Sequence, residues 1–313
     1  MKRISCGHSF LLGVDKPVGL SSHGAVAQVR RSIGESRVGH AGTLDPAASG
    51  VLLMGVGQAT RLLGIITLDD KRYRARIAFG SETATDDAEG AVIRTAPVGD
   101  ELFDEGYARA ALAALEGTHE QVPPAFSAIS VEGTRAYALA RKGEEPELAP
   151  RPITIHGASL ASIGICAGIV TWTCEFHVSK GTYIRSLARD LGRRLGSAAY
   201  LSGLERTASG TVGIDDCIGL GQLDEGGLEL ALARALDPLR VLPYPHRPLT
   251  SDEHADVLNG RPIRLRGSER ACLAGDGIVC LVRAGRLWGI WERRGSHLVS
   301  LSTFPQGIEG VRL

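Results

Sequence analysis

The pattern of apolar and polar residues divides the first part of the chain into short strands and helices. The segment "SFLLGVDKP" predicts a short buried strand that ends at Pro17. The segment "SSHGAVAQVRRSIG" predicts a helix with Ser21 or Ser22 as its N-cap and Gly34 at its C-terminal end. A loop of about sixteen residues is expected from Glu35 to Gly50. The segments "VLLMGVG" and "YRARIAFG" then predict a buried strand and a half-buried strand.

The same kind of pattern continues to about residue 236. The segments "YARAALAALEG" and "TRAYALARKG" predict helices, "SAISVEG" predicts a strand, and "ITIHGASLASIGI" with "GIVTWTCEFHVSKG" predicts a long hairpin. The strands do not alternate regularly with helices, which disfavours a doubly wound parallel sheet. The clearest helix is "TYIRSLARDLGRRLG", because its apolar residues fall on one face: Ile184, Leu187, Ala188, Leu191 and Leu195.

The last part of the chain has a different character. After about Leu236, the segment "DPLRVLPYPHRP" is rich in proline and predicts a linker. The tail, residues 245–313, is strand-like and rich in glycine, with ten arginines, no lysine and seven acidic residues. We expect it to form a small β-rich second domain.

The composition is typical of a globular protein, with 43% hydrophobic residues, 22% charged residues and a formal net charge of zero. The charges are segregated along the chain. Basic residues outnumber acidic ones by nine to five in residues 15–76 and by six to two in residues 180–206, whereas residues 82–147 have five basic and fourteen acidic residues. This distribution is compatible with an ordinary solvated surface and with a basic face that binds an anionic polymer.

Several classes of protein are disfavoured by what the sequence lacks. The six cysteines form no C-x-x-C pair, which favours reduced, buried thiols in a cytoplasmic protein. The apolar run before Asp15 is too short for a signal peptide, and no run approaches membrane-spanning length. No H-E-x-x-H motif or close His/Asp cluster indicates a metal site. We therefore expect a cytoplasmic protein without a membrane partner or a metal.

One loop is a candidate for chemistry. The stretch "RVGHAGTLDPAASGVLLMGVG" contains a single carboxylate, Asp45, together with five glycines and one proline. Pro46 favours extended backbone at Asp45, and glycines allow the backbone to come close to a bulky ligand. These features describe a carboxylate presented beside His40, but an Asp-Pro pair is also a common way to open a turn. The residues alone leave both interpretations open.

Other patterns are weaker or depend on context. The segment "GVGQATR" resembles the start of a dinucleotide-binding motif, but it lacks the third glycine and the later acidic residue. Lysine is rare in this chain, yet Lys16 and Lys180 both lie in short glycine-containing stretches, which suggests a specific use of a compact charge. Arg185 lies in the first turn of a predicted helix, four residues before Arg189, where a positive charge is unfavourable. A nearby carboxylate such as Asp45 would explain Arg185, and a solvated helix face is the alternative.

Four motifs occur in order between about Leu11 and Gly213. They are "VDKPVGLSSH", "RVGHAGTLDPAASGVLLMGVGQATRL", "VPPAFSAISVEGTRAYALARKG" and "VSKGTYIRSLARDLG", with "KRYRARIAFGSETATDDAEG" between the second and the third. In these motifs the chain resembles the bacterial tRNA pseudouridine synthases of the TruB type. The resemblance is specific because several motifs agree in both order and spacing.

The resemblance implies a fold and a reaction. The expected fold is α+β, a mixed and largely antiparallel sheet flanked by helices, with residues 1–240 as the catalytic domain and residues 245–313 as a PUA-like RNA-binding domain. Members of this family isomerise uridine 55 in the T-loop of tRNA to pseudouridine, on a flipped-out nucleotide and without a cofactor or metal. The expected partner is therefore the T-arm of tRNA, and the expected state is a monomer. Attack at C1′, attack at C6 and a glycal route all stay open.

The resemblance also assigns roles to individual residues. Asp45 in "GTLDP" corresponds to the nucleophile, and Arg185 in "GTYIR" corresponds to the arginine that pairs with it. Tyr73 in "KRYRA" corresponds to a tyrosine that stacks on the target uracil and is a candidate proton acceptor. The other implied substrate-binding residues are Lys16, His40, Tyr183 and Leu204. Contacts with the tRNA backbone are expected from Lys180, Arg189 and Arg206.

The chain departs from the family pattern at three positions. The family usually has threonine where Ala41 stands, tyrosine where Phe126 stands and arginine where Glu205 stands. Glu205 puts a negative charge in place of an expected phosphate contact, which predicts an altered tRNA affinity rather than a loss of chemistry. A non-catalytic tRNA-binding or tRNA-folding protein and a nucleotide-cofactor enzyme are the alternative functions. The combination of Asp45 with Arg185 argues against the first of them.

Overall fold

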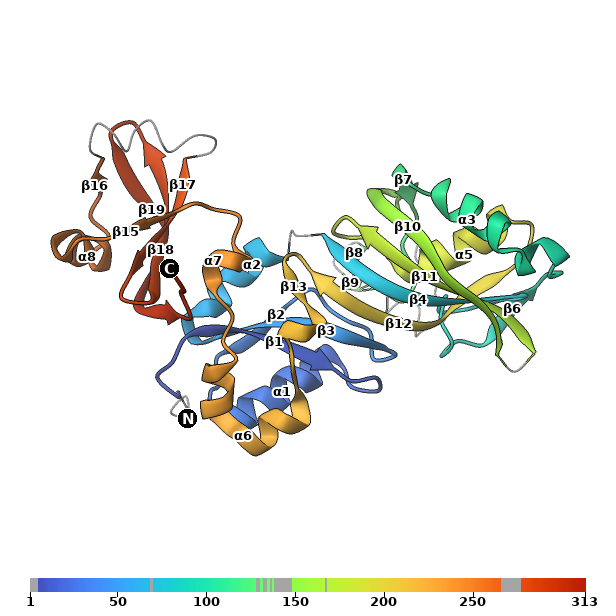
Figure 1. Cartoon of the computed structure of the whole chain (residues 1–313), viewed down its shortest axis with the longest axis horizontal. Coiled ribbons are helices and arrows are strands. Elements are labelled where there is room, and N and C mark those ends of the chain that lie inside the picture. Colours follow the sequence, from blue (N-terminus) through green and yellow to red (C-terminus); the bar gives the residue numbers. More distant parts are fainter. Residues whose placement is uncertain are drawn as a thin grey trace. The chain divides into compact units, whose positions relative to one another are not determined.

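A computed structural model describes residues 5–67, 70–127, 130–131, 134–135, 137, 148–166, 168–265 and 277–313. The chain forms two compact units, and many of their helices and strands are labelled in Figure 1. Unit 1 consists of Met1–Pro46, Gly50–Leu68 and Ser209–Leu313, and unit 2 consists of Ala47–Ser49 and Asp69–Ala208. The strand and the helix predicted for "SAISVEG" and "TRAYALARKG" lie largely outside the described residues. Besides Ser127 and Tyr137, the described residues there are the short antiparallel pair β8 (Ser130–Val131) and β9 (Thr134–Arg135), so the first two residues of the predicted helix are in a strand.

The first sheet of unit 1 is built around two of the predicted buried strands. Strand β1 (Phe10–Lys16) is antiparallel to β3 (Ala48–Val56) along its whole length, and β14 (Ile218–Gly219) is parallel to β1. Strand β2 (Val38–Ala41) pairs with β3 in antiparallel register. The predicted loop between residues 35 and 50 is therefore too long. Its first part gains strand hydrogen bonds from β3, and this long-range pairing leaves no local signal in a glycine-rich segment.

The helices of unit 1 begin with α1 (Ser22–Ile33), which confirms the helix prediction. The Ser21 side chain accepts a hydrogen bond from the backbone of Gly24, and Gly34 ends the helix in the left-handed conformation with φ 65°. Helix α1 packs against α6 (Leu220–Ala233), where Gln28 donates a hydrogen bond of 2.7 Å to Asp224. The shorter elements are η1 (Gly57–Leu62), α2 (Leu63–Ile66), β13 (Val212–Gly213), η3 (Ile214–Asp216) and α7 (Pro238–Val241).

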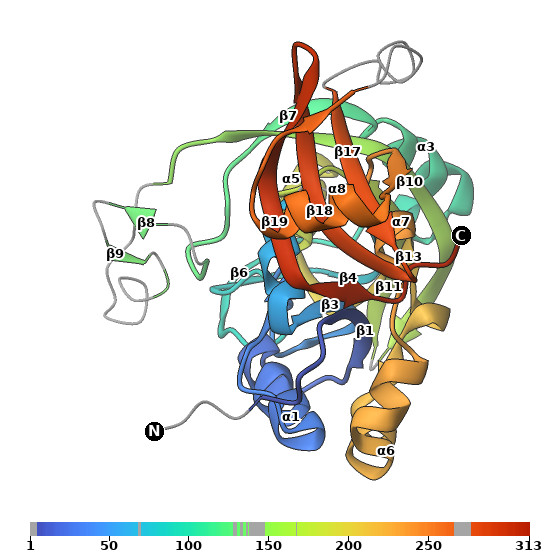
Figure 2. The ribbon, with the colours of Figure 1, turned by 90° about the vertical axis from the view of Figure 1, so that its left-hand side faces the viewer.

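The tail is β-rich, as expected. Its five-stranded sheet has the order β15-β17-β18-β19-β16, and the long strands β18 and β19 are seen in Figure 2. Among the described tail residues, one short helix accompanies the strands. The elements are β15 (His246–Pro248), α8 (Ser251–Leu258), β16 (Ile263–Arg264), β17 (Ile278–Arg283), β18 (Arg286–Arg294) and β19 (His297–Glu309).

The tail shares its packing with the start of the chain. Phe304 and Ile308 belong to the same hydrophobic cluster as Leu11 and Leu62, and the backbone N–H of residue 309 donates to the carbonyl of residue 9 at 2.8 Å. The proline-rich segment before the tail is not a simple linker, because Pro238 opens helix α7. The proposed boundary near residue 240 thus falls inside one compact unit, and its functional meaning stays a prediction.

Unit 2 contains a second group of strands in the order β12-β4-β11-β10-β7. Strands β4, β11, β10 and β7 pair antiparallel in turn, so the predicted hairpin is confirmed as β10 with β11. The mixed, largely antiparallel α+β class is likewise confirmed. The strands are β4 (Lys71–Phe79), β5 (Ser81–Thr83), β6 (Val92–Thr95), β7 (Gly117–Gln121), β10 (Arg151–Cys166), β11 (Ile169–Val178) and β12 (Ala199–Ser209).

Among the described residues, helices α3 (Glu105–Ala113) and α5 (Ile184–Arg194) enclose the core of unit 2 together with β4, β10, β11 and β12, and η2 (Asp100–Phe103) precedes α3. The predicted apolar face of α5 is buried, and Leu195, just beyond its end, packs against the same core. Burying each large apolar side chain stabilises the fold by about 1.5–3 kcal/mol. Among the described residues, none of the helices is long and apolar enough to span a membrane.

Candidate active site

The loop that carries Asp45 is held by neutral groups on both sides of the carboxylate. The Ser22 hydroxyl, at the start of α1, accepts a hydrogen bond from the Leu44 N–H and donates one to the Leu44 carbonyl, both at 2.9 Å. The Gly19 N–H donates to the carbonyl of Pro46 at 2.8 Å. Asp45 itself is half-buried. Its two neighbours in sequence are therefore fixed while the carboxylate keeps some access to solvent.

Two glycines set the path of the chain around this loop. Gly42 has φ 74° and Gly50 has φ 101°, which are left-handed conformations that other residues rarely adopt. They lie just before and just after the Leu44–Pro46 segment. The glycines of the predicted loop therefore serve the backbone turn around Asp45.

Two further predicted residues of unit 1 are Lys16, which holds the turn that contains Gly19, and His40, which precedes the Asp45 loop in the chain. Lys16 is fully buried, and its ammonium donates to the carbonyls of Pro17 at 2.9 Å and Leu20 at 2.7 Å. It thereby closes the turn that contains Gly19, the residue bonded to Pro46. His40 lies on β2, and its ring meets the ring of His23 edge to face at a centroid distance of 5.6 Å.

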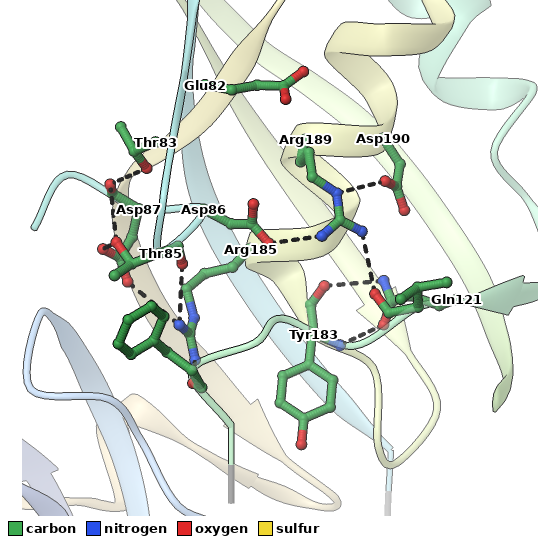
Figure 3. A network of polar contacts seen from close by, with 12 residues as sticks. Glu82, Thr83, Thr85, Asp86, Asp87, Gln121, Tyr183, Arg185, Arg189 and Asp190 are labelled. Carbon is green, nitrogen blue, oxygen red and sulfur yellow. Dashed lines mark hydrogen bonds and ion pairs between the residues drawn. The ribbon is translucent and has the colours of Figure 1, made fainter. Parts of the chain in front are cut away.

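Arg185 is the centre of a polar network in unit 2 (Figure 3). It lies in the first turn of α5 and is 6% exposed. Its guanidinium donates to the carbonyls of Thr85 and Phe126, both at 3.1 Å, and lies 3.6 Å from the carboxylate of Asp87. The alternative of a solvated helix face is therefore wrong for Arg185. Asp45 belongs to the other compact unit, and its pairing with Arg185 stays a prediction.

The other predicted residues of unit 2 lie near the same helix or the same core. Tyr183 precedes α5, and its backbone exchanges two hydrogen bonds with the Gln121 side chain, at 2.8 and 3.0 Å. Tyr73 on β4 and Leu204 on β12 are half-buried and pack against the hydrophobic core that α5 also covers. Unit 2 thus gathers two tyrosines, a leucine and a buried arginine.

Sequence reasoning missed the acidic turn that holds α5. Asp86 adopts a left-handed backbone with φ 60°, and its carboxylate lies 2.9 Å from the guanidinium of Arg189. Burial raises the pKa of the Asp86 carboxyl, while Arg189 and Arg185 act in the opposite direction. The available signal was the adjacent acid pair in "TATDDAEG", because aspartate tolerates the left-handed conformation that tight turns need.

The three residues predicted to contact the tRNA backbone have very different surroundings. Lys180 is exposed. The side chain of Arg189 is 13% exposed and bonded to Asp86 and Asp190. Arg206 is 1% exposed. A phosphate contact by either arginine would require it to leave its buried position, so burial favours this role for Lys180 alone.

The three departures from the family pattern also have distinct settings. Ala41 is a buried residue of β2, and Phe126 supplies the carbonyl that accepts a hydrogen bond from Arg185. Glu205 lies 3.7 Å from the guanidinium of Arg74, which is 51% exposed. An exposed ion pair of this kind contributes little to stability, so Glu205 is a surface charge.

Comparisons with known proteins agree with the family resemblance that the sequence motifs indicated. Residues 30–184 match the model of the TruB family pseudouridylate synthase N-terminal domain. The chain is 44% identical over 268 residues to a protein of Mycobacterium sp. (strain KMS) named tRNA pseudouridine synthase B, covering 85% of this chain and 89% of that protein. A protein of the same name from Arthrobacter sp. (strain FB24) is 44% identical over 306 residues, covering 96% of this chain and 98% of that protein.

Solved structures show the same fold at low sequence identity. The crystal structure of the archaeal box H/ACA sRNP Nop10-Cbf5 complex aligns with a TM-score of 0.66 and 21% identity, over 95% of this chain and 86% of that one. This likeness shows the fold. The family match and the relatives show the class: the chain belongs to the TruB family of pseudouridylate synthases, which are isomerases.

Proposed function

We propose that this enzyme isomerises uridine 55 in the T-loop of tRNA to pseudouridine, with Asp45 as the nucleophile. The tRNA substrate is supported by the names of the relatives that are 44% identical to this chain over the aligned residues. The observation that carries the catalytic assignment is the Asp45 loop. It contains one carboxylate, and hydrogen bonds fix the residues on both sides of it.

The reaction needs no external reactant. The C1′–N1 glycosidic bond of the target uridine breaks, the uracil turns, and a C1′–C5 bond forms. The proton on C5 leaves to a base, and N1 takes up a proton, so the product has the same atoms as the substrate. A carboxylate that attacks either C1′ or C6 serves this sequence, and it must be ionised to do so. Asp45 fills this role in the proposal.

Residues of unit 2 bind the flipped uracil and keep the carboxylate of the nucleophile ionised in the proposal. A uracil that leaves the stack of the T-loop loses stacking energy, and an aromatic face offsets part of that loss. We assign the stacking to Tyr73, whose hydroxyl is also the candidate acceptor for the C5 proton. Tyr183 and Leu204 complete the pocket for the base. Arg185 keeps the nucleophile ionised, because a guanidinium lowers the pKa of a neighbouring carboxyl.

The tail and the exposed basic residues bind the rest of the tRNA. Arg261 and Arg294 of the tail are 71% and 70% exposed, and Lys180 of unit 2 is exposed as well. Phosphate contacts of this type raise affinity and make it dependent on salt. The tail thus acts as the RNA-binding module in the proposal, while the residues between Lys16 and Leu204 carry out the reaction.

The test is to map the product on a defined RNA. The enzyme is incubated without cofactor with an unmodified tRNA transcript, and pseudouridine is located by nuclease digestion and nucleoside analysis. The proposal expects pseudouridine at position 55, and no product on a transcript with cytidine at that position. Binding without any pseudouridine would instead favour the alternative, a non-catalytic tRNA-binding or tRNA-folding protein. Product at another position would contradict the assignment to uridine 55.

A further inference from the structure

Two arginines one helical turn apart on α5 bind the same pair of segments (Figure 3). Arg185 binds the acidic turn through Asp87 and binds the segment after β7 through the carbonyl of Phe126. Arg189 repeats this arrangement: it binds the turn through Asp86 at 2.9 Å and the later segment through the carbonyl of Val122 at 3.1 Å. The first arginine belongs to the proposed site, and the second has no role in it.

Asp86 connects more than one element of unit 2. Its side chain reaches Arg189 on α5, and its carbonyl accepts a hydrogen bond of 3.0 Å from the N–H of Leu201 on β12. Its backbone is left-handed, with φ 60°, a conformation that costs energy in a residue other than glycine and persists where the surroundings hold it. The next residue, Asp87, faces Arg185.

Arg189 fixes a second segment next to a predicted pocket residue. The carbonyl that it binds belongs to Val122, and the preceding residue, Gln121, exchanges two hydrogen bonds with the backbone of Tyr183. The Asp86–Arg189 pair therefore lies where the segments that carry Arg185, Tyr183 and Leu204 meet. Both side chains are nearly buried, with 10% and 13% exposure, so a phosphate could reach Arg189 only after this pair separated.

We propose that Asp86 and Arg189 are positioning residues: their buried ion pair locks the acidic turn and the Val122 segment to α5, and so holds Arg185 and Tyr183 in place for the reaction. Neither residue touches the substrate. This inference rests on the proposed function and assigns to Arg189 a structural contact in place of one to the tRNA backbone. The pair should therefore affect the chemical step and leave the affinity for tRNA unchanged.

The chain offers a matched control for this proposal. Arg189 also bonds Asp190 at 2.8 Å, but that carboxylate is 44% exposed. A carboxylate that stays in contact with water contributes less to an ion pair than a buried one, so Asp190→Asn removes one charge beside the same arginine without breaking the buried Asp86–Arg189 pair. The test variants are Asp86→Asn and Arg189→Met, with the double variant. Arg189→Lys serves as a milder change, because it keeps the charge but cannot reach Asp86 and Val122 together.

The experiment measures the single-turnover rate at saturating tRNA, the affinity for tRNA at two salt concentrations, and thermal unfolding. We expect Asp86→Asn and Arg189→Met to lower the rate by about tenfold or more, with affinity within about twofold of wild type. The double variant should be no slower than the slower single variant, because both substitutions break the same Asp86–Arg189 ion pair. Arg189→Lys should lower the rate by a smaller factor, and Asp190→Asn should match wild type.

Two results would overturn the proposal. If Arg189→Met weakened tRNA binding and reduced its salt dependence while Asp86→Asn behaved as wild type, Arg189 would be a phosphate ligand. If all the folded variants, Arg189→Lys included, reacted at the wild-type rate, the Asp86–Arg189 pair would have no part in positioning Arg185 and Tyr183. A wild-type enzyme that forms no pseudouridine would refute the proposed function itself, which separates that failure from both of these results.

Discussion

The two regions proposed to act on the uridine are held by different kinds of force. In unit 1, the neighbours of Asp45 are fixed by one hydroxyl and one backbone amide, both of them neutral. In unit 2, helix α5, which carries Arg185 in its first turn, is fixed by carboxylates, through Asp86, Asp87 and Glu82. Neutral hydrogen bonds hold the loop without placing a charge next to the Asp45 carboxylate. Ion pairs with hydrogen bonds, in contrast, fix the orientation of a guanidinium. The difference predicts that the two regions respond differently to substitution and to pH.

Short of replacing Asp45, the largest effect is expected at Tyr73. In Tyr73→Phe the ring still stacks on the uracil, but the hydroxyl that would accept the C5 proton is lost. We expect the single-turnover rate to fall by about a hundredfold or more while tRNA affinity stays within about twofold. Tyr107→Phe is a suitable control, because this tyrosine lies on α3 with 37% exposure. A fully active Tyr73→Phe would reduce Tyr73 to a stacking surface.

The neutral scaffold is tested at Ser22. In Ser22→Ala the Leu44 N–H and carbonyl lose their partner, which costs about 1–3 kcal/mol where no water replaces it. We expect the reaction to slow by about tenfold, since the loop that presents Asp45 loosens. Ser21→Ala removes the N-cap of the same helix and costs about 1 kcal/mol, but it leaves Leu44 bound. If both variants lost the same activity, the effect of Ser22 would come from helix stability alone.

The ionic scaffold is tested at Glu82, whose side chain is 2% exposed and ion-paired to Arg193 and Arg94. Hydrogen bonds from Arg193, and then from Arg94, lower the pKa of the Glu82 carboxyl from 4.5 to about 2. Because the pKa is lowered in the folded state, the stabilisation is complete above about pH 4.5 and is lost as the pH falls towards 2. Glu82→Gln should lower the free energy of unfolding by about 2 kcal/mol at pH 7, allowing for the solvent exposure of both arginines.

The measurement for Glu82 is urea unfolding of both proteins at pH 7 and near pH 3. The difference between Glu82→Gln and wild type should shrink as the pH falls. Glu105→Gln breaks the exposed pair with Arg109, in which both side chains are more than half exposed, and should change stability by less than about 0.5 kcal/mol. A difference for Glu82→Gln that stayed constant with pH would show that packing, and not charge, holds this end of α5.

The smallest effect is expected in the tail. Replacing the exposed Arg261, Arg264 and Arg294 by serine should weaken tRNA binding by about three- to tenfold at low salt and flatten its salt dependence, with no change in the saturating rate. The matched control replaces three exposed arginines outside the tail: Arg31, Arg109 and Arg151. Equal losses in both triple variants would mean that general positive charge, and not the tail, attracts the tRNA. Substitutions suit this question better than truncation, because tail residues share a core with β1.

Local patterns in the sequence were sufficient for much of the fold. The N-cap and C-cap of α1, the apolar face of α5 and the β10–β11 hairpin each have a local signal, and all three were predicted. Strand β2 has no such signal, because its hydrogen bonds come from β3. The packing of the tail against β1 depends on contacts between residues almost three hundred positions apart, which no local pattern encodes.

The candidate site was predicted unevenly for similar reasons. Motifs indicated Asp45 and Arg185, but the unfavourable position of Arg185 at a helix start was compatible with both a carboxylate partner and a solvated helix face. The partner found within unit 2 is Asp87, which comes from a turn a hundred residues earlier in the chain. Ser22 was considered only as a helix cap, because a serine at a helix start usually has that role. Its bonds to Leu44 follow from tertiary packing alone.

The most direct test of the account is the single-turnover rate of Asp45→Asn. The amide has the size of the carboxylate but cannot attack the nucleotide. With saturating tRNA labelled with tritium at uracil C5, we expect tritium release to fall by about a thousandfold or more, about 4 kcal/mol in the barrier, while tRNA affinity is unchanged. Asp215→Asn, at an exposed carboxylate of the same unit, should release tritium at the wild-type rate. Release by Asp45→Asn within about tenfold of wild type would contradict the central claim that Asp45 is the nucleophile.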